Sequence, residues 1–219
     1  MRIVGTLVWI LLSMACLAQN DSLMLTNNTP FEEGIYLTRE AFTNNRPDFQ
    51  WEEVGGNIFI NQKNHTARIE GLYSKLDSIR KPLPNIWGFC RFGVPFRQID
   101  TIDNYQRFST IKVRGRLCYY NYLQPVEKTV EIIAYNPKTG IPFRRGQVNH
   151  EEEELVARFF EYETGQEYDF DLTVFMDYIR RRDEKLWNSL NKLAAEEANK
   201  KLYKCLLIYN DRHPLFIDK

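Results

Sequence analysis

The sequence predicts an α+β fold, with a β-rich antiparallel body of hairpins followed by two C-terminal helices that pack on it. Short runs of alternating apolar and polar residues fill residues 31–170, between turns rich in Gly, Pro and Asn. After Phe170 the apolar period changes from two residues to about 3.6. Strands first and helices later is the order typical of α+β proteins.

Composition restricts the class of protein further. The chain has 219 residues, of which 43% are hydrophobic, with 29 basic and 29 acidic side chains. These fractions are ordinary for a globular protein of one domain or two small ones. Zero net charge argues against a broad electrostatic surface for DNA or RNA. We therefore expect no nucleic-acid partner.

Residues 1–18 have the organisation of an export signal. Arg2 precedes the apolar run Ile3–Leu12, and Ala18 is the small residue before a cut at Gln19. This run is shorter than a spanning helix needs, and no later run is long enough, so we expect no transmembrane span in the mature chain. The expected location is periplasmic or secreted. Two alternatives stay open: a retained N-terminal anchor, and a lipoprotein signal that anchors the protein to the membrane through Cys16.

The first half of the mature chain is expected to contain a linker and short strands. Residues 19–30 are polar and predict a linker. Gly34–Thr38 and Asn57–Gln62 predict strands, whereas Leu72–Arg80 fits a strand or a helix equally well.

Two hairpins are predicted in the middle of the chain. The first joins Ile86–Phe92 to Val94–Ile99 through Gly93, and the second joins Tyr105–Val113 to Arg116–Gln124 through Gly115. The last of these strands is apolar on both faces, so we expect it to be central and covered on both sides. One face carries Leu117, Tyr119 and Leu123, and the other carries Cys118, Tyr120 and Tyr122.

Further strands are predicted at Lys128–Tyr135 and Glu154–Tyr162. Between them the core signal is weak, because residues 136–153 are mostly polar and include Pro137 and Gly140. Two interpretations follow for residues 31–170: one compact unit, or two lobes divided near residues 135–150.

Residues 171–219 predict the helical segment. Asp171 can cap a first helix that ends near Arg180–Arg182. Asp183 can cap a second, longer helix that continues to about Asn210, before Pro214 prevents its continuation.

Three cysteines remain after the signal: Cys90, Cys118 and Cys205. An oxidising compartment permits a disulfide, and Cys90–Cys118 is the best pairing because both residues lie in predicted strands. The alternative is three buried thiols that act as small hydrophobic side chains.

Several segments together resemble uncharacterised secreted proteins of Bacteroidetes, a group with no assigned reaction. They are GIYLTREAFTNNRPDF (34–49), IWGF (86–89), GRLCYYNY (115–122), YETGQEYDF (162–170) and YNDRHPL (209–215). The resemblance covers most of the mature chain and implies export in a bacterial envelope. It implies no catalytic residue.

Few residues suggest chemistry. His150 and Glu151–Glu154 could bind a divalent metal, but consecutive residues of a strand face opposite ways, so a solvated acidic loop is the expected structure. No nucleotide-binding, zinc or G-x-S-x-G motif is present in the sequence, and we expect no cofactor. Trp51, between Gln50 and Glu52, is the candidate for an exposed ligand-binding aromatic side chain.

The sequence therefore predicts a non-enzymatic interaction or structural module of the cell envelope, with an envelope protein or a glycan as partner. The first alternative is a module that binds a glycan, a peptide or a small ligand. The second is a hydrolase of unknown class that uses His150. No oligomeric state follows from the sequence.

Overall fold

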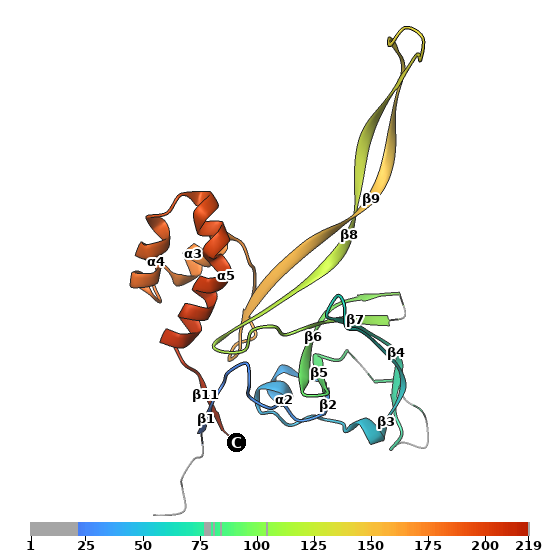
Figure 1. Ribbon diagram of the computed structural model, residues 1–219. Coiled ribbons are helices and arrows are strands. Elements are labelled where there is room, and N and C mark those ends of the chain that lie inside the picture. Colours follow the sequence, from blue (N-terminus) through green and yellow to red (C-terminus); the bar gives the residue numbers. More distant parts are fainter. Residues whose placement is uncertain (1–21, 77–79, 81, 84, 104, 219) are drawn as a thin grey trace, which may run out of the picture.

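The computed structural model describes residues 22–76, 80, 82, 83, 85–103 and 105–218. Within them the fold is α+β, with antiparallel sheets and helices in the C-terminal part (Figure 1). The predicted export signal at residues 1–18, including Cys16, lies outside the described residues. In the described part of the chain, no helix is both long and apolar enough to cross a membrane.

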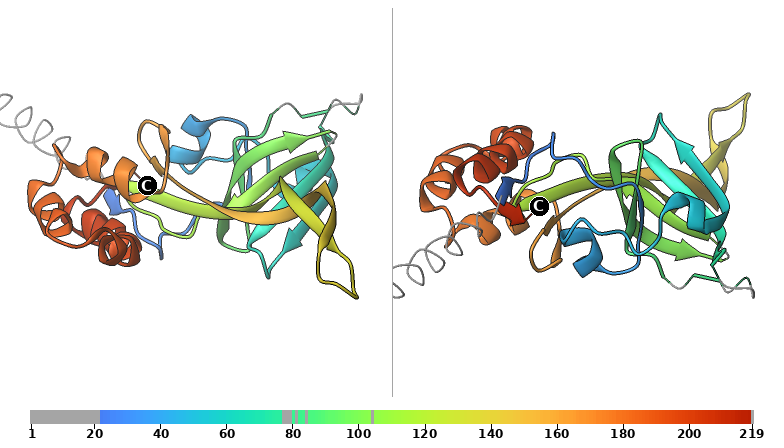
Figure 2. Two further views of the ribbon diagram at one scale, coloured as in Figure 1. Left: turned by 90° about the horizontal axis from the view of Figure 1, so that it is seen from above. Right: turned by 90° about the horizontal axis from the view of Figure 1, so that it is seen from below.

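A six-stranded antiparallel sheet forms one side of the body, in the order β2-β5-β6-β7-β4-β3. Its strands are β2 (Gly34–Tyr36), β3 (Val54–Asn61), β4 (Thr66–Ser74), β5 (Gly88–Arg91), β6 (Val94–Ile102) and β7 (Tyr105–Thr110). Ile35 of edge strand β2 and Val54 of edge strand β3 belong to one core cluster with Phe89. The sheet must therefore curl around this core, as Figure 2 shows. Two short helical segments, α2 (Arg39–Thr43) and η1 (Trp51–Glu53), connect β2 to β3.

A long hairpin of β8 (Leu117–Tyr135) and β9 (Pro142–Glu161) dominates the second sheet, where β10 (Glu167–Asp169) pairs with β9. The first part of the hairpin lies between the six-stranded sheet and the helices (Figures 1 and 2). Leu117 and Tyr119 pack with the helices, and Cys118, Tyr120 and Tyr122 pack on the opposite side. This confirms the central, two-faced strand, except that Leu123 lies at its margin and is half-buried.

The C-terminal segment contains three helices where two were predicted: α3 (Leu172–Ile179), α4 (Glu184–Asn191) and α5 (Ala195–Arg212). Asp171 and Asp183 cap α3 and α4 as expected. The predicted long helix breaks at residues 192–194, and Ala194, the N-cap residue of α5, provides no side-chain cap. The sequence shows no capping residue, Gly or Pro at this break, which explains the wrong prediction. The break lets Leu186 of α4 and Leu206 of α5 reach the same core.

The linker prediction is wrong for the described residues 22–30. Ser22–Met24 form β1, which pairs antiparallel with the last strand, β11 (Phe216–Asp218). Leu25 is buried, and its backbone N–H donates to the Leu215 carbonyl at 2.8 Å. A strand this short has too few residues to show an alternating pattern.

The hairpin of Ile86–Phe92 with Val94–Ile99 is confirmed as β5–β6, but the second hairpin is wrong. β7 pairs with β6 and β4, and the strand after Gly115 crosses to the other sheet, leaving only an isolated bridge between Val113 and Tyr119. Gly115 serves a different purpose. A Cβ at this position would lie 2.6 Å from the side-chain amide of Asn210. That amide donates to the Leu117 carbonyl at 2.8 Å and accepts from the Leu117 N–H at 2.9 Å, which fastens α5 to β8.

The division into two lobes near residues 135–150 is also wrong. These residues form the outer end of one continuous hairpin, in which β8 and β9 stay in register from Leu117↔Glu161 to Ala134↔Arg144. The core signal is weak there because this part of the hairpin contacts no core.

The Cys90–Cys118 disulfide is not formed. Cys90, Cys118 and Cys205 are buried free thiols, which was the alternative left open. Cys90 and Cys118 belong to the same core cluster. Burial raises the pKa of both thiols to about 12, so they stay protonated.

Candidate functional site

The most unusual feature of the molecule is a projecting arm, defined as residues 124–155 of the β8–β9 hairpin. It extends away from both the helices and the six-stranded sheet (Figure 1). Nearly all of its side chains are exposed, on both faces of the ribbon. Except near the root, where Pro125 and Glu151–Glu153 lie beside the six-stranded sheet, both faces of this two-stranded ribbon are free of other described elements.

Local sequence closes the arm at its tip. The Asn136 carbonyl accepts from the Gly140 N–H at 2.8 Å, and the Asn136 side chain accepts from the Lys138 N–H at 2.9 Å. Gly140 has a φ of 66°, which glycine adopts without steric cost. The turn that looked like a boundary between lobes is thus the end of a hairpin.

Apolar side chains are exposed along the arm. Val130 and Val148 face each other across the strands, and Ile132 continues the same face. Tyr135, Ile141 and Phe143 surround the tip, and Phe143 is 70% exposed. Two-stranded hairpins alone are at best marginally stable in water, and contiguous exposed apolar patches mark interaction sites. The arm therefore has the properties of a surface that binds something.

Charge is segregated along β9 and the turn at the tip of the arm. Lys138, Arg144 and Arg145 lie at or near the tip, and Glu151–Glu154 lie toward the body. Within the arm, Lys128 pairs with Glu152 at 2.8 Å and Arg145 with Glu131 at 3.9 Å. The hydrogen bond from Lys128 lowers the pKa of Glu152.

The predicted acidic loop at His150 and Glu151–Glu154 is instead part of strand β9. Alternation places consecutive carboxylates on opposite faces. Among the described residues, no group of three or more His, Cys, Asp or Glu residues is placed to bind a metal. His150 lies on the exposed ribbon opposite Lys128.

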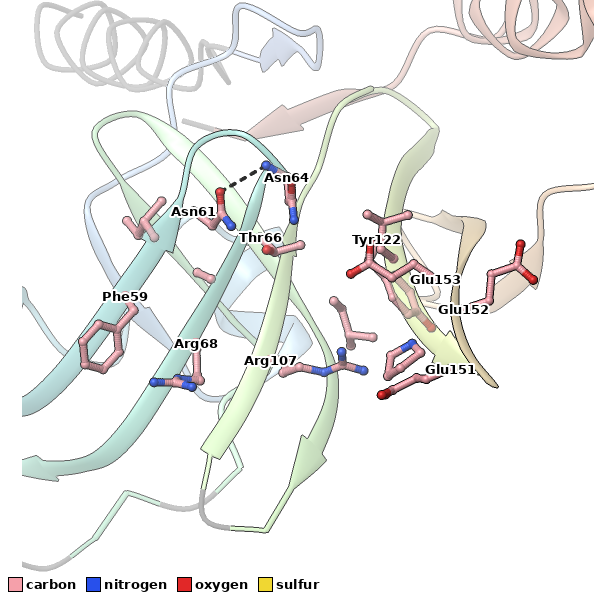
Figure 3. A pocket seen from close by; sticks show the side chains of 15 residues that line it. Phe59, Asn61, Asn64, Thr66, Arg68, Arg107, Tyr122, Glu151, Glu152 and Glu153 are labelled. Atoms are coloured by element: carbon pink, nitrogen blue, oxygen red, sulfur yellow. Dashed lines mark hydrogen bonds between the residues drawn. The ribbon is translucent and has the colours of Figure 1, made fainter. Parts of the chain in front are cut away.

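A groove of about 720 Å³ lies where the arm leaves the body (Figure 3). The β3–β4 hairpin and β7 supply Phe59, Arg68 and Arg107 to one wall, while Tyr122 and Glu151–Glu153 come from the arm side. Arg68 lies over the Phe59 ring at 5.0 Å and pairs with Glu70 at 3.0 Å. Arg107 makes a two-pronged pair with Asp100, one bond of which is 2.7 Å. Both guanidinium groups thus already have carboxylate partners.

Trp51, the predicted ligand-binding aromatic residue, lies elsewhere and is half-buried. Its indole N–H donates to the Cys90 carbonyl at 3.0 Å, and the Arg91 guanidinium covers the ring at 4.7 Å. Flanking polar residues suggested exposure, but the ring packs edge-on against Phe89. Trp51 thus packs at the margin of the sheet core, where it also lines a pocket with Arg91 and Phe92.

A cluster of titratable side chains lies between β9, α3 and α5. The Tyr178 hydroxyl donates to Glu161 at 2.8 Å, Arg182 lies 3.3 Å from the same carboxylate, and Arg116 pairs with Glu163 at 2.6 Å. Burial and the Glu161 carboxylate raise the pKa of Tyr178, so its hydroxyl remains a donor. The contacts of Glu161 fasten α3 and the turn after it to the root of the hairpin, and each of the two carboxylates has a cation beside it.

No family model, no curated protein and no solved structure matches this chain.

Proposed function

We propose that the protein is an exported, non-enzymatic interaction module of the cell envelope and that the arm is its binding element. One observation carries the proposal: a β-ribbon projects from a well-packed body with apolar side chains exposed on it. The body itself buries three aromatic-rich cores. Of the fourteen large hydrophobic side chains that are exposed among the described residues, seven lie on the arm.

The free energy gained by burying apolar side chains supports a binding role for the arm. An isolated ribbon gains little from its own cross-strand contacts, because each pair contributes only about 0.2–1 kcal/mol. Val130, Ile132, Val148 and Phe143 would gain from burial against a partner. The N-terminal export pattern and the resemblance to secreted Bacteroidetes proteins support the envelope as the place where that partner is met.

Photo-cross-linking in the native cells tests the proposal. A photoreactive amino acid at Phe143 should give a discrete adduct, because this ring is exposed at the arm tip. The matched control is the same amino acid at Asn199, an exposed position of α5 on the body. Adducts of equal yield at both positions, or at neither, would contradict the proposal.

The groove favours a second candidate function, the binding of a glycan, a peptide or a small ligand. The exposed Phe59 ring and the amide of Asn64 are groups that stack on and hydrogen-bond to such ligands. A ligand of this kind should raise the melting temperature, and Phe59→Ala should remove the increase while Trp51→Ala leaves it unchanged. A screen of oligosaccharides and peptides without any shift would exclude this function.

A further inference from the structure

The two outer edges of the arm differ in their capacity to bind another strand. On β8, the outward-pointing backbone groups belong to odd-numbered residues, since the Tyr119 N–H donates to the Val113 carbonyl at 3.0 Å. On β9 they also belong to odd-numbered residues. The Glu161 N–H donates to Gln166 at 3.0 Å, and the Ala157 carbonyl accepts from Phe170 at 2.9 Å. The continuous register carries this alternation along the arm.

Proline interrupts only one of these edges. Pro125 is an odd-numbered residue of β8, so its missing N–H leaves the pairing with β9 intact and removes a donor from the outer edge. Natural proteins protect edge strands from other chains in this way. From Arg145 to Leu155, the outer edge of β9 contains no proline and retains its row of donors and acceptors.

The charge pattern of the same edge is self-complementary. β9 reads RRGQVNHEEEE over residues 144–154, so cations lie at one end and carboxylates at the other. A second copy that runs antiparallel along this edge brings its carboxylate end beside the cations of the first copy. Among the ion pairs within the described residues, none involves Arg144, Glu153 or Glu154.

We propose that this edge of β9 pairs antiparallel with the same edge of a second copy of the chain, around a two-fold axis at Asn149. The inference rests on the proposed function and names the partner of the arm. A two-fold axis perpendicular to the ribbon leaves each side chain on the face where it already lies. Residues directly opposite each other in an antiparallel pair share a face, so the two residue numbers of each pair must add to an even number. Centred at Asn149, the pairing places Arg145 opposite Glu153 and Arg144 opposite Glu154 of the second copy.

The exposed apolar side chains fit this register. Phe143 comes beside Leu155 of the second copy, and these side chains are 70% and 60% exposed in the single chain. Asn149 points its backbone N–H and C=O outward, so the central pair exchanges two hydrogen bonds across the axis. The two ribbons become one four-stranded sheet, in which each tip is covered near the root of the other arm.

Sedimentation of mixed charge variants tests the pairing. The variant R144E/R145E carries acidic residues at both ends of the edge, and E153R/E154R carries basic residues at both ends. Each alone should dissociate at a concentration at least about tenfold higher than the wild type, because like charges then face each other. An equimolar mixture should restore a dimer that contains one chain of each kind.

Two proline variants separate edge pairing from other modes of association. Asn149→Pro removes the central outward N–H of β9, and Thr129→Pro removes the outward N–H of β8 at the position directly opposite. Both lose the same side-chain contact, since Thr129 Oγ1 and Asn149 Oδ1 lie 3.1 Å apart. Only N149P should dissociate the dimer. Circular dichroism and melting curves show whether the two variants retain the same fold.

A wild-type chain that sediments as a monomer at all concentrations would overturn the self-pairing. So would a dimer that survives N149P, or charge variants that do not recombine. If the chain is a monomer but the arm still cross-links to a different envelope protein, the self-pairing fails and the proposed function stands. If the arm neither cross-links nor self-associates, both fail.

Discussion

Phe159→Ala is expected to lower the free energy of unfolding by about 3–5 kcal/mol, the usual cost of truncating a buried aromatic side chain. Phe159 is fully buried at the root of β9. Its ring centroid lies 5.0 Å from that of Tyr168, 5.4 Å from Tyr178 and 5.8 Å from Phe175. The substitution removes a central contact between the helices and the hairpin, so we expect cooperative destabilisation of both.

The matched control is Phe143→Ala on the same strand. Phe143 is 70% exposed, so its truncation should change the stability of the single chain by no more than about 0.5 kcal/mol. Urea unfolding of both variants at low protein concentration and high salt, where self-association is weakest, measures the contrast. An equal loss in the two variants would mean that the arm tip is packed on the body in solution, contrary to the structure.

Asp183→Ala should lower the free energy of unfolding by about 2–3 kcal/mol, because one carboxylate stabilises two helix ends. Its Oδ1 accepts from the Leu186 N–H at 2.9 Å and so caps α4. The same carboxylate lies 3.1 Å from Arg212 at the end of α5 and 3.3 Å from the His213 ring. Asp183→Asn keeps the capping acceptor and loses the charge, so it should cost less than the Ala variant.

The contribution of Asp183 also depends on pH. Burial alone would raise the pKa of this carboxyl, but the Leu186 N–H and the Arg212 guanidinium outweigh burial and hold the pKa below its ordinary value. The unfolded chain therefore binds more protons in this range. The stabilisation is complete above about pH 4 and is lost as the pH falls through the folded-state pKa.

The difference in unfolding free energy between the wild type and Asp183→Asn should accordingly shrink below pH 4. Urea unfolding at several pH values from 2 to 7 measures this difference. The other carboxylates are present in both proteins, so their contributions cancel in the difference. A difference that stays constant over that range would show that Asp183 is not held ionised by these contacts.

Features of the fold set by local sequence could be predicted. The alternation of Leu117, Tyr119, Cys118 and Tyr120 indicated a strand covered on both sides, since side-chain direction in a strand depends only on position. The helix starts at Asp171 and Asp183 followed from capping chemistry that acts within four residues.

Features that depend on distant partners could not be predicted. The pairing of β7 with β4 joins residues far apart in the chain, and no local pattern contains such a register. Gly115 was interpreted as a hairpin turn, although its small size serves the close approach of Asn210. Trp51 has polar neighbours in sequence, and its contacts with Arg91 and Phe89 come from strand β5, a proximity that no local pattern indicates.

The arm was missed for a different reason. Residues 135–150 contain few residues typical of a core, and such a stretch usually marks the boundary between two lobes. The predicted strands at Lys128–Tyr135 and Glu154–Tyr162 leave the residues between Gly140 and Glu154 without a strand, so a continuous hairpin does not follow from them. The opposite charges of Arg144–Arg145 and Glu151–Glu154 are also evident in the sequence. Whether they can pair with a second copy depends on which backbone edge of the strand is exposed, and the sequence does not show this.

The pairing of β1 with β11 has a consequence for the order in which the chain can fold. The ribosome makes Ser22–Met24 long before Phe216–Asp218, so this two-stranded sheet cannot form until Phe216–Asp218 have left the ribosome. Until then Leu25, which the finished protein buries beside Leu215, stays in contact with solvent. The pairing of β1 is thus a late step in folding, and a chain shortened before Phe216 should leave β1 without its partner strand.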